Sequence, residues 1–252
     1  MSELAVAAII CACVLGGAAA GIRLRHVLPE HHMNEQSRQI VNVAIGLIAT
    51  LAALVLGLLV ASAKSSFDDR NEEVKSSAAK IILLDRVLRQ YGPEAQPTRD
   101  LLRELTQRRI ERTFGKAAFA TVTSVNDAKS AEQLRAALFE LAPNSDAQRW
   151  LVGRALAIVS EIEEARWLLV EENRSSIPTP FLVVLVFWLS VIFASLGLYA
   201  PPNATVYAIL IVCALSVSTA IYMILEMDQP YDGLLRISPM PLRNALDELK
   251  QP

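Results

Sequence analysis

Long uncharged stretches alternate with charged ones along the chain. Three of the uncharged stretches are long enough to cross a membrane: Leu4–Ile22 with 19 residues, Ile40–Ala63 with 24 and Ser175–Leu225 with 51. Because a helix crosses a bilayer core with about 20 apolar residues, each of the first two runs suits one crossing. The third run is long enough for two, and "APPNA" at 200–204 divides it. The pattern therefore predicts four transmembrane helices, the last two over Phe181–Tyr199 and Thr205–Leu225.

The first uncharged run has the features of a retained span. A signal peptide carries positive charge before its apolar region and a small-residue cleavage site after it. Here the chain begins with "MSEL", and the positive residues Arg23 and Arg25 follow the run. We therefore expect this segment to remain in the membrane as the first transmembrane helix.

The segment between the second and third spans is polar and evenly charged. Residues 64–177 contain 18 basic and 18 acidic side chains. A nucleic-acid-binding domain would show a one-sided basic excess, so this balance argues against such a partner. Low glycine content and alternating apolar and charged positions indicate helix throughout the segment.

The sequence thus predicts an all-α, polytopic membrane protein with a helical extramembrane domain inserted between its second and third spans. The expected parts are transmembrane helices 1 and 2 in 1–63, the helical domain in 64–177, a transmembrane hairpin in 178–225 and a C-terminal tail in 226–252.

Four helices are predicted in the polar segment. The first continues the second span without a break and stops at Gly92-Pro93, a strong helix stop. The second begins after Pro97 with Thr98 as its cap. The third and fourth begin at the capping-box sequences "SAEQ" at Ser130 and "SDAQ" at Ser145, and run to about Leu141 and Asn173. The stretch "GKAAFATVTSVNDAK" before Ser130 receives no assignment.

The tail is predicted to contain one short amphipathic helix. Ser238 is its expected cap, and Pro239 suits the first helical position. One face of this helix is apolar: Leu242, Ala245, Leu246 and Leu249. The sequence leaves two places open for it, the membrane surface and the helical domain.

Basic residues near the ends of spans predict the orientation, because they favour the cytoplasmic side. The side of the large domain has six: Lys64, Arg70, Lys75, Arg166, Arg174 and Arg236. The side of the first loop has three: Arg23, Arg25 and Arg38. The first helix taken alone points the other way, but the total places the domain in the cytoplasm.

Several stretches resemble the bestrophin-like domain family of bacterial membrane proteins. They are "GLIATLAALVLGLLVASAKSSFD", "LLDRVLRQYGPEA", "SSIPTPFLVVLVFWLSVIFASLGLYAPPNAT" and "LEMDQPYDGLLRISPMPLRNAL", together with "LPEHH" in the first loop. The resemblance covers most of the chain except roughly 113–145. It implies kinship with bestrophins, which are oligomeric anion channels lined by their second transmembrane helix. It also implies a multi-pass protein of the plasma membrane, the inner membrane of a bacterium.

The second span carries a stripe of small and polar residues. Its members are Asn42, Gly46, Thr50, Ala53, Gly57, Ala61 and Lys64. Their spacing of three or four residues aligns them on one face of a helix. Small residues at such spacing allow close helix packing in a membrane, which is one interpretation. The other is a pore wall, with Asn42 and Thr50 bonding a passing ion and Lys64 attracting anions to the mouth.

Beyond the span, the same helix carries a heptad-like seam. Phe67, Val74, Ile81 and Leu88 recur every seven residues, as expected of a helix that packs against a neighbour.

Two further clusters have a chemical and a plain interpretation. Glu226, Asp228 and Asp232 follow the fourth span. They could bind a cation or form an ion pair with Arg236, or they could simply cap the end of a helix. His26, His31 and His32 lie near Glu30 in the first loop. They could form a metal site or a pH sensor, but we favour the interpretation that they belong to a solvated loop.

No pattern of an enzyme is present. The sequence has no glycine-rich phosphate loop and no paired metal-ligand motif, and we expect neither a cofactor nor a catalytic residue. Two functions stay open: a homo-oligomeric chloride channel, and a non-conducting membrane scaffold whose helical domain recruits a partner protein. The expected partners are the lipid bilayer, further copies of the chain and an anion such as chloride.

Overall fold

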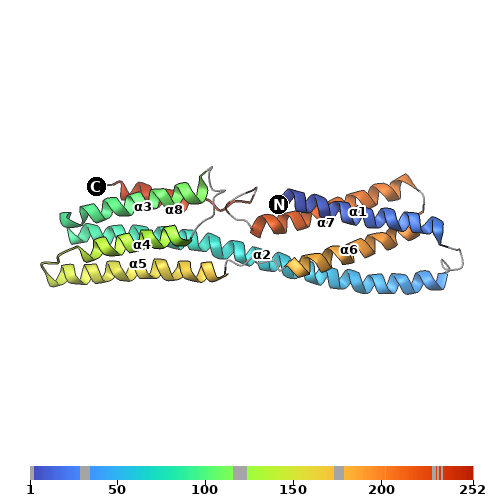
Figure 1. The fold of residues 1–252 in the computed structure, drawn as a ribbon, viewed down its shortest axis with the longest axis horizontal. Coiled ribbons are helices and arrows are strands. Elements are labelled where there is room, and N and C mark those ends of the chain that lie inside the picture. The colour runs from blue at the N-terminus through green and yellow to red at the C-terminus, as the bar shows by residue number, and fades with distance from the viewer. Residues whose placement is uncertain are drawn as a thin grey trace. The chain divides into compact units, whose positions relative to one another are not determined.

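A computed structural model describes most of the chain. The described residues are 3–28, 35–115, 124–172, 179–201, 203–228, 231, 233 and 235–251. Their contacts divide the chain into two compact units: unit 1 is Met1–Phe67 with Ser175–Leu235, and unit 2 is Asp68–Arg174 with Arg236–Pro252. All regular secondary structure in the described part is helical, which confirms the all-α class (Figure 1).

In the described part of the chain, four helices are long and apolar enough to cross a membrane. They are α1 (Glu3–Val27), α2 (Glu35–Tyr91), α6 (Thr179–Tyr199) and α7 (Ala204–Asp228). Each contains one of the four segments predicted from the uncharged runs, so the predicted number of spans is confirmed. The chain is therefore a multi-pass membrane protein.

In unit 1, α1 packs along both α6 and α7 (Figure 1). The contact with α6 depends on glycine. A Cβ atom added to Gly17 would lie 2.5 Å from the carbonyl oxygen of Ser190, and one added to Gly21 would collide with the Ala194 carbonyl. Because both positions lack a side chain, the two backbones approach closely, as in small-xxx-small membrane helix pairs. Sequence reasoning missed this contact, although the Gly17–Gly21 spacing is its signal.

Helix α2 runs for 57 residues and belongs to both units. This confirms that the second span continues as one helix. It ends at Tyr91 because Gly92 has a φ of 124°, which other residues rarely adopt, and Pro93 follows. A short 3₁₀ helix, η2 (Pro93–Ala95), then leads into the next element.

Unit 2 contains the second part of α2 with α3 (Gln96–Phe114), α4 (Ser124–Phe139), α5 (Asp146–Glu172) and α8 (Met240–Leu249). Helix α3 packs on α4 and α8, and α4 packs on α5. In the heptad-like seam, Val74, Ile81 and Leu88 are buried, while Phe67 is half-buried. The seam therefore contributes to the core of this same chain.

Three helix starts differ from the prediction. Helix α8 begins at Met240 with Pro239 as its N-cap residue, so Ser238 is not the cap and Pro239 is not the first helical residue. Helix α3 begins at Gln96, and Thr98 is a buried residue within its first turn instead of its cap. Pro97 is the reason, since proline is tolerated at the first helical positions. Helix α4 begins at Ser124, six residues before Ser130. Residues 124–129 contain neither glycine nor proline, so nothing in the sequence stops the helix from starting earlier.

The N-cap hydrogen bond of the predicted capping box at Ser145 is confirmed, while the reciprocal bond of the Gln148 side chain goes to Asn144 instead of Ser145. The Gln148 N–H donates to Ser145 Oγ at 3.1 Å, and the Gln148 side chain accepts from the Asn144 N–H at 2.8 Å. Its amide also donates to the carbonyl oxygen of Tyr91 at 3.1 Å, which joins the start of α5 to the end of α2. The unassigned residues 116–123 lie outside the described part.

Helix α8 packs on α3, so of its two expected places the helical domain is the correct one (Figure 1). Its apolar face is buried through Leu242, Ala245 and Leu249. Carbonyl oxygens at its C-terminus and just after it accept hydrogen bonds from arginines: Glu248 from Arg89 at 2.9 Å, Leu249 from Arg103 at 2.7 Å and Gln251, beyond the helix, from Arg99 at 3.5 Å. Cations at this end also complement the helix dipole.

Candidate functional site

The stripe of small and polar residues on α2 faces away from the rest of its own chain. All seven members are exposed: Asn42, Gly46, Thr50, Ala53, Gly57, Ala61 and Lys64. A Cβ atom added to Gly46 or to Gly57 would meet no other atom within 4 Å. Close packing within the chain therefore does not explain the stripe.

A different face of α2 holds the helix in unit 1. Ala52, Leu59 and Ala63 are buried there, with exposed fractions of 4%, 5% and 0%. Val55 and Leu56 are partly buried against the same apolar core. The helix thus has one face committed to its own chain, and the stripe lies on the remaining open surface together with exposed apolar residues such as Val43, Leu47 and Leu54.

The polar members of the stripe differ in what they can offer an ion. The Thr50 hydroxyl donates to the carbonyl oxygen of Gly46 at 2.8 Å, so in this rotamer it presents lone pairs outward. The Asn42 amide is exposed and has two N–H donors. The Lys64 ammonium lies 5.8 Å from the centre of the Phe67 ring, a cation–π contact that holds the charge near the end of the apolar segment.

The acidic cluster is only partly assembled. Glu226 is buried, with 5% of its surface exposed, and accepts a hydrogen bond from the Tyr222 hydroxyl one helical turn earlier. Gly233, with a φ of 90°, lies so close that a Cβ atom would collide with the Glu226 carboxylate. Asp228 is half-buried at the end of α7, and Asp232 lies outside the described residues. Glu226 therefore connects α7 to the turn that follows it.

The histidine cluster cannot be assembled from the described residues. His26 lies in the last turn of α1, whereas Glu30, His31 and His32 fall outside the described part. In the part of the chain that the structure does describe, no three His, Cys, Asp or Glu side chains are placed to hold a metal ion.

Two arginines on either side of the first loop, Arg25 in α1 and Arg38 in α2, make contacts that the sequence did not indicate. Arg25 donates to the carbonyl oxygen of Ala200, just after the C-terminus of α6. The Arg38 guanidinium lies 5.6 Å from the centre of the Tyr199 ring. These contacts bring the end of α1 and the start of α2 to the end of α6 at one side of unit 1.

Comparison with known families adds a decisive observation. The sequence model of the bestrophin-like domain matches residues 12–242. The chain belongs to the bestrophin-like domain family. The match confirms the resemblance seen in the sequence and includes the stripe, the acidic cluster and all of unit 2 up to the start of α8. No curated protein and no solved structure matches this bestrophin-like chain.

Proposed function

We propose that this bestrophin-like protein is a homo-oligomeric anion channel in which copies of α2 line the pore. The observation that carries the proposal is the exposure of the whole stripe, while another face of α2 packs on unit 1. The name of the family points in the same direction, since it relates the chain to bestrophin anion channels.

The bilayer explains why exposed polar residues on a span are expected to face other helices or water. Polar side chains within a span usually face a bundle interior or a water-filled cavity, because lipid cannot satisfy them. Asn42 and Lys64 lie at the two ends of the stripe, and both residues are exposed. Other copies of the chain around a common axis would cover the stripe or leave water beside it.

The charges of the stripe favour anions over cations. Residues 40–63 contain no acidic side chain, and Lys64 follows at the end. The Asn42 amide can donate hydrogen bonds to a partly dehydrated chloride. Since most basic residues flank this end of the spans, we expect Lys64 and residues 64–177 in the cytoplasm of a plasma membrane, the inner membrane of a bacterium.

The scaffold function has one observation in its favour. Phe139 at the end of α4 and Trp150 near the start of α5 are 69% and 67% exposed. Exposed aromatic side chains are common anchors of protein interfaces. A partner protein bound there would not require conduction, so the two functions are separated only by a flux measurement.

The test compares chloride flux and oligomer mass for the same preparations of purified protein in liposomes. Gly57→Leu adds a bulky side chain to the stripe. Gly16→Leu is the matched control, because Gly16 of α1 is also an exposed glycine with no atom within 4 Å of an added Cβ. We expect wild type and Gly16→Leu to form an oligomer that conducts chloride, and Gly57→Leu to keep the oligomer but lose most of the flux.

Each other outcome is informative. Loss of the oligomer in Gly57→Leu alone would show that the stripe packs subunits together without lining a pore. A wild-type oligomer with no chloride flux would favour the scaffold, and a monomer would exclude any central pore.

A further inference from the structure

Two arginines from different helices of unit 1 meet at the end of α6. Arg25, in the last turn of α1, donates to the carbonyl oxygen of Ala200. The guanidinium of Arg38, near the start of α2, lies 5.6 Å from the centre of the Tyr199 ring. Because Tyr199 and Ala200 are consecutive, with Cα atoms about 3.8 Å apart, the fold brings both cations to one short segment.

Both arginines lie where the apolar part of a span ends. The uncharged run of α1 stops at Ile22 and that of α2 begins at Ile40, so each arginine is within three residues of its run. Tyr199 is the last residue of α6. Tyrosine is enriched at the same level of a bilayer, the boundary between hydrocarbon and water. We therefore expect the two guanidiniums at the depth of the lipid phosphates.

Hydrogen-bond donors remain on both arginines. Toward the residues that the structure describes, Arg38 makes the ring contact but no hydrogen bond, and Arg25 makes one hydrogen bond, to Ala200. A guanidinium has five N–H groups. Most of the donors at this end of unit 1 are therefore not used by the described part of the chain.

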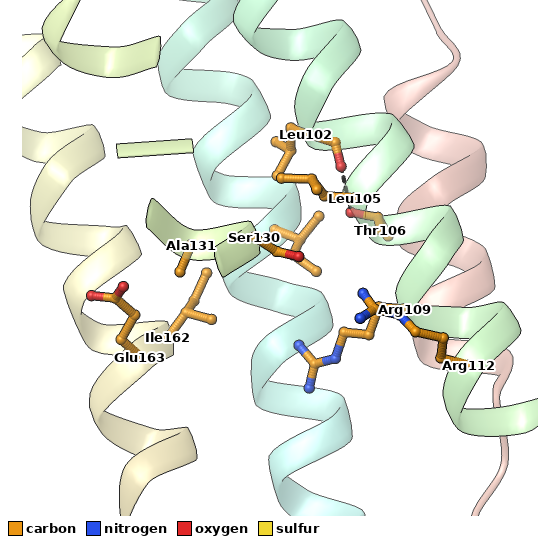
Figure 2. Close-up of a pocket in the computed structure, with 10 residues that line it drawn as sticks. Leu102, Leu105, Thr106, Arg109, Arg112, Ser130, Ala131, Ile162 and Glu163 are labelled. Carbon is orange, nitrogen blue, oxygen red and sulfur yellow. Dashed lines mark hydrogen bonds between the residues drawn. The ribbon is translucent and has the colours of Figure 1, made fainter. Parts of the chain in front are cut away.

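The arginines beside the cavity of unit 2 differ in this respect. Figure 2 shows Arg109 and Arg112 at that cavity, whose volume is about 100 Å³. Arg109 donates to Ser77 Oγ at 2.6 Å and forms an ion pair with Glu73 at 3.3 Å. Arg112 donates to the carbonyl oxygen of Arg108 at 3.2 Å. These side chains have partners within their own chain, so the cavity is the weaker candidate for an anion.

The end of unit 1 near α6 has an excess of positive charge. Residues 23–38 contain three arginines and two glutamates, and residues 199–204 contain no charged side chain. Arg23, the third arginine, is exposed. Of the two carboxylates, Glu35 is exposed and forms no ion pair with a described residue, and Glu30 lies outside the described residues. An anion is therefore favoured here over a cation.

Exposed apolar side chains lie next to the two arginines along the chain. In α1 they are Leu24 and Val27, with exposed fractions of 48% and 78%. In α2 they are Ile40 and Val43, at 71% and 72%. An anion bound at these arginines would thus lie beside an apolar surface, as the phosphate of a phospholipid does.

We infer that Arg25 and Arg38 bind the phosphate group of an anionic phospholipid such as phosphatidylglycerol. Guanidinium groups bind phosphate well because two parallel N–H groups can donate to two of its oxygens. The acyl chains would cover the neighbouring apolar side chains. The glycerol head group adds no cation, whereas the choline of phosphatidylcholine would bring a positive charge toward the arginines. The inference does not depend on whether α2 lines a pore.

The test is native mass spectrometry of the full chain in detergent, supplied with equal amounts of phosphatidylglycerol and phosphatidylcholine that have the same acyl chains. We expect the protein to retain phosphatidylglycerol at least about fivefold more than phosphatidylcholine, since one basic residue near a bilayer surface contributes a factor of this size. Equal retention of the two lipids would overturn the inference. Millimolar glycerol phosphate should not displace the lipid; displacement would indicate a site for soluble phosphate esters and would contradict the assignment to a phospholipid.

Variants of Arg38 locate the site, because Arg25 also holds the end of α6. Arg38→Gln removes the charge and should lower the preference for phosphatidylglycerol about fivefold. Arg38→Lys keeps the charge but loses the paired N–H groups, so its preference should lie between those of Arg38→Gln and wild type. Arg236→Gln is the matched control: Arg236 is also an exposed arginine, but it follows the opposite end of α7 in the sequence.

Thermal unfolding checks that each variant is folded. A wild-type preference in folded Arg38→Gln would contradict the site. An equal loss in Arg38→Gln and Arg236→Gln would also contradict it, because it would indicate a general attraction of anionic lipid to a basic protein surface.

Discussion

The Nε–H group of Arg99 in α3 donates to the carboxylate of Asp85 in α2 at 2.9 Å, inside unit 2. The Asp85 side chain is only 2% exposed, and its other oxygen accepts from Arg89 at 2.7 Å. Both arginines also donate to carbonyl oxygens at or just after the end of α8. Asp85 therefore positions the cations that hold the C-terminal helix.

Asp85→Asn should destabilise unit 2, because it removes the charge that compensates two buried or half-buried arginines. Breaking such a pair costs about 3 kcal/mol, which lowers the melting temperature by roughly 6–12 °C. Asp100→Asn is the control: Asp100 pairs with Arg103 at 3.2 Å but is 55% exposed, so a change below about 1 kcal/mol is expected. Thermal unfolding followed by tryptophan fluorescence measures both. Equal shifts in the two variants would argue against a special role of Asp85.

Gly21→Ala should separate α1 from α6, since the new methyl group would collide with the Ala194 carbonyl. Overpacking of this kind costs about 1–3 kcal/mol. Gly16→Ala makes the same chemical change in open space and should leave stability within about 1 kcal/mol of wild type. Melting temperatures in one detergent provide the comparison. If Gly21→Ala were as stable as Gly16→Ala, the close contact of these helices would be wrong.

Lys64→Glu should reduce the preference for anions in the proposed channel, because it reverses a charge at the mouth of the pore. A loss of about tenfold in the chloride-to-sodium permeability ratio is expected, corresponding to a change of about 1.4 kcal/mol in local ion energy. Lys75→Glu lies on the same helix in unit 2 and is the control; its side chain is 52% exposed. Reversal potentials in planar bilayers give the ratio. An unchanged ratio in Lys64→Glu would remove this residue from the mouth.

Cysteine labelling tests the orientation. Ala136→Cys introduces a thiol at an exposed position of α4, and Asn203→Cys introduces one between α6 and α7. With unit 2 in the cytoplasm, an impermeant thiol reagent on intact cells should label position 203 and leave position 136 unlabelled until the cells are opened. The parent chain gives the background from Cys11, Cys13 and Cys213, which lie in the spans. The opposite labelling pattern would reverse the orientation.

The number of spans and several helix ends could be predicted from the sequence, because local physics decides them. A bilayer requires a run of apolar residues of one length, so the uncharged runs were sufficient evidence for α1, α2, α6 and α7. Gly92-Pro93 ends α2, and the box at Ser145 begins α5, through atoms only a few residues apart. Where local signals competed, at Thr98 and Ser130, the prediction was wrong.

Only the tertiary structure decided which surfaces are used. The stripe on α2 is small enough to pack tightly, yet the chain packs Ala52, Leu59 and Ala63 instead and leaves the stripe outside. The glycine contact of α1 depends on Ala194, and the place of α8 depends on Asp85; each partner lies more than a hundred residues away in the sequence. Periodicity identifies the face of a helix, but the partner that covers that face is chosen by the folding of the whole chain.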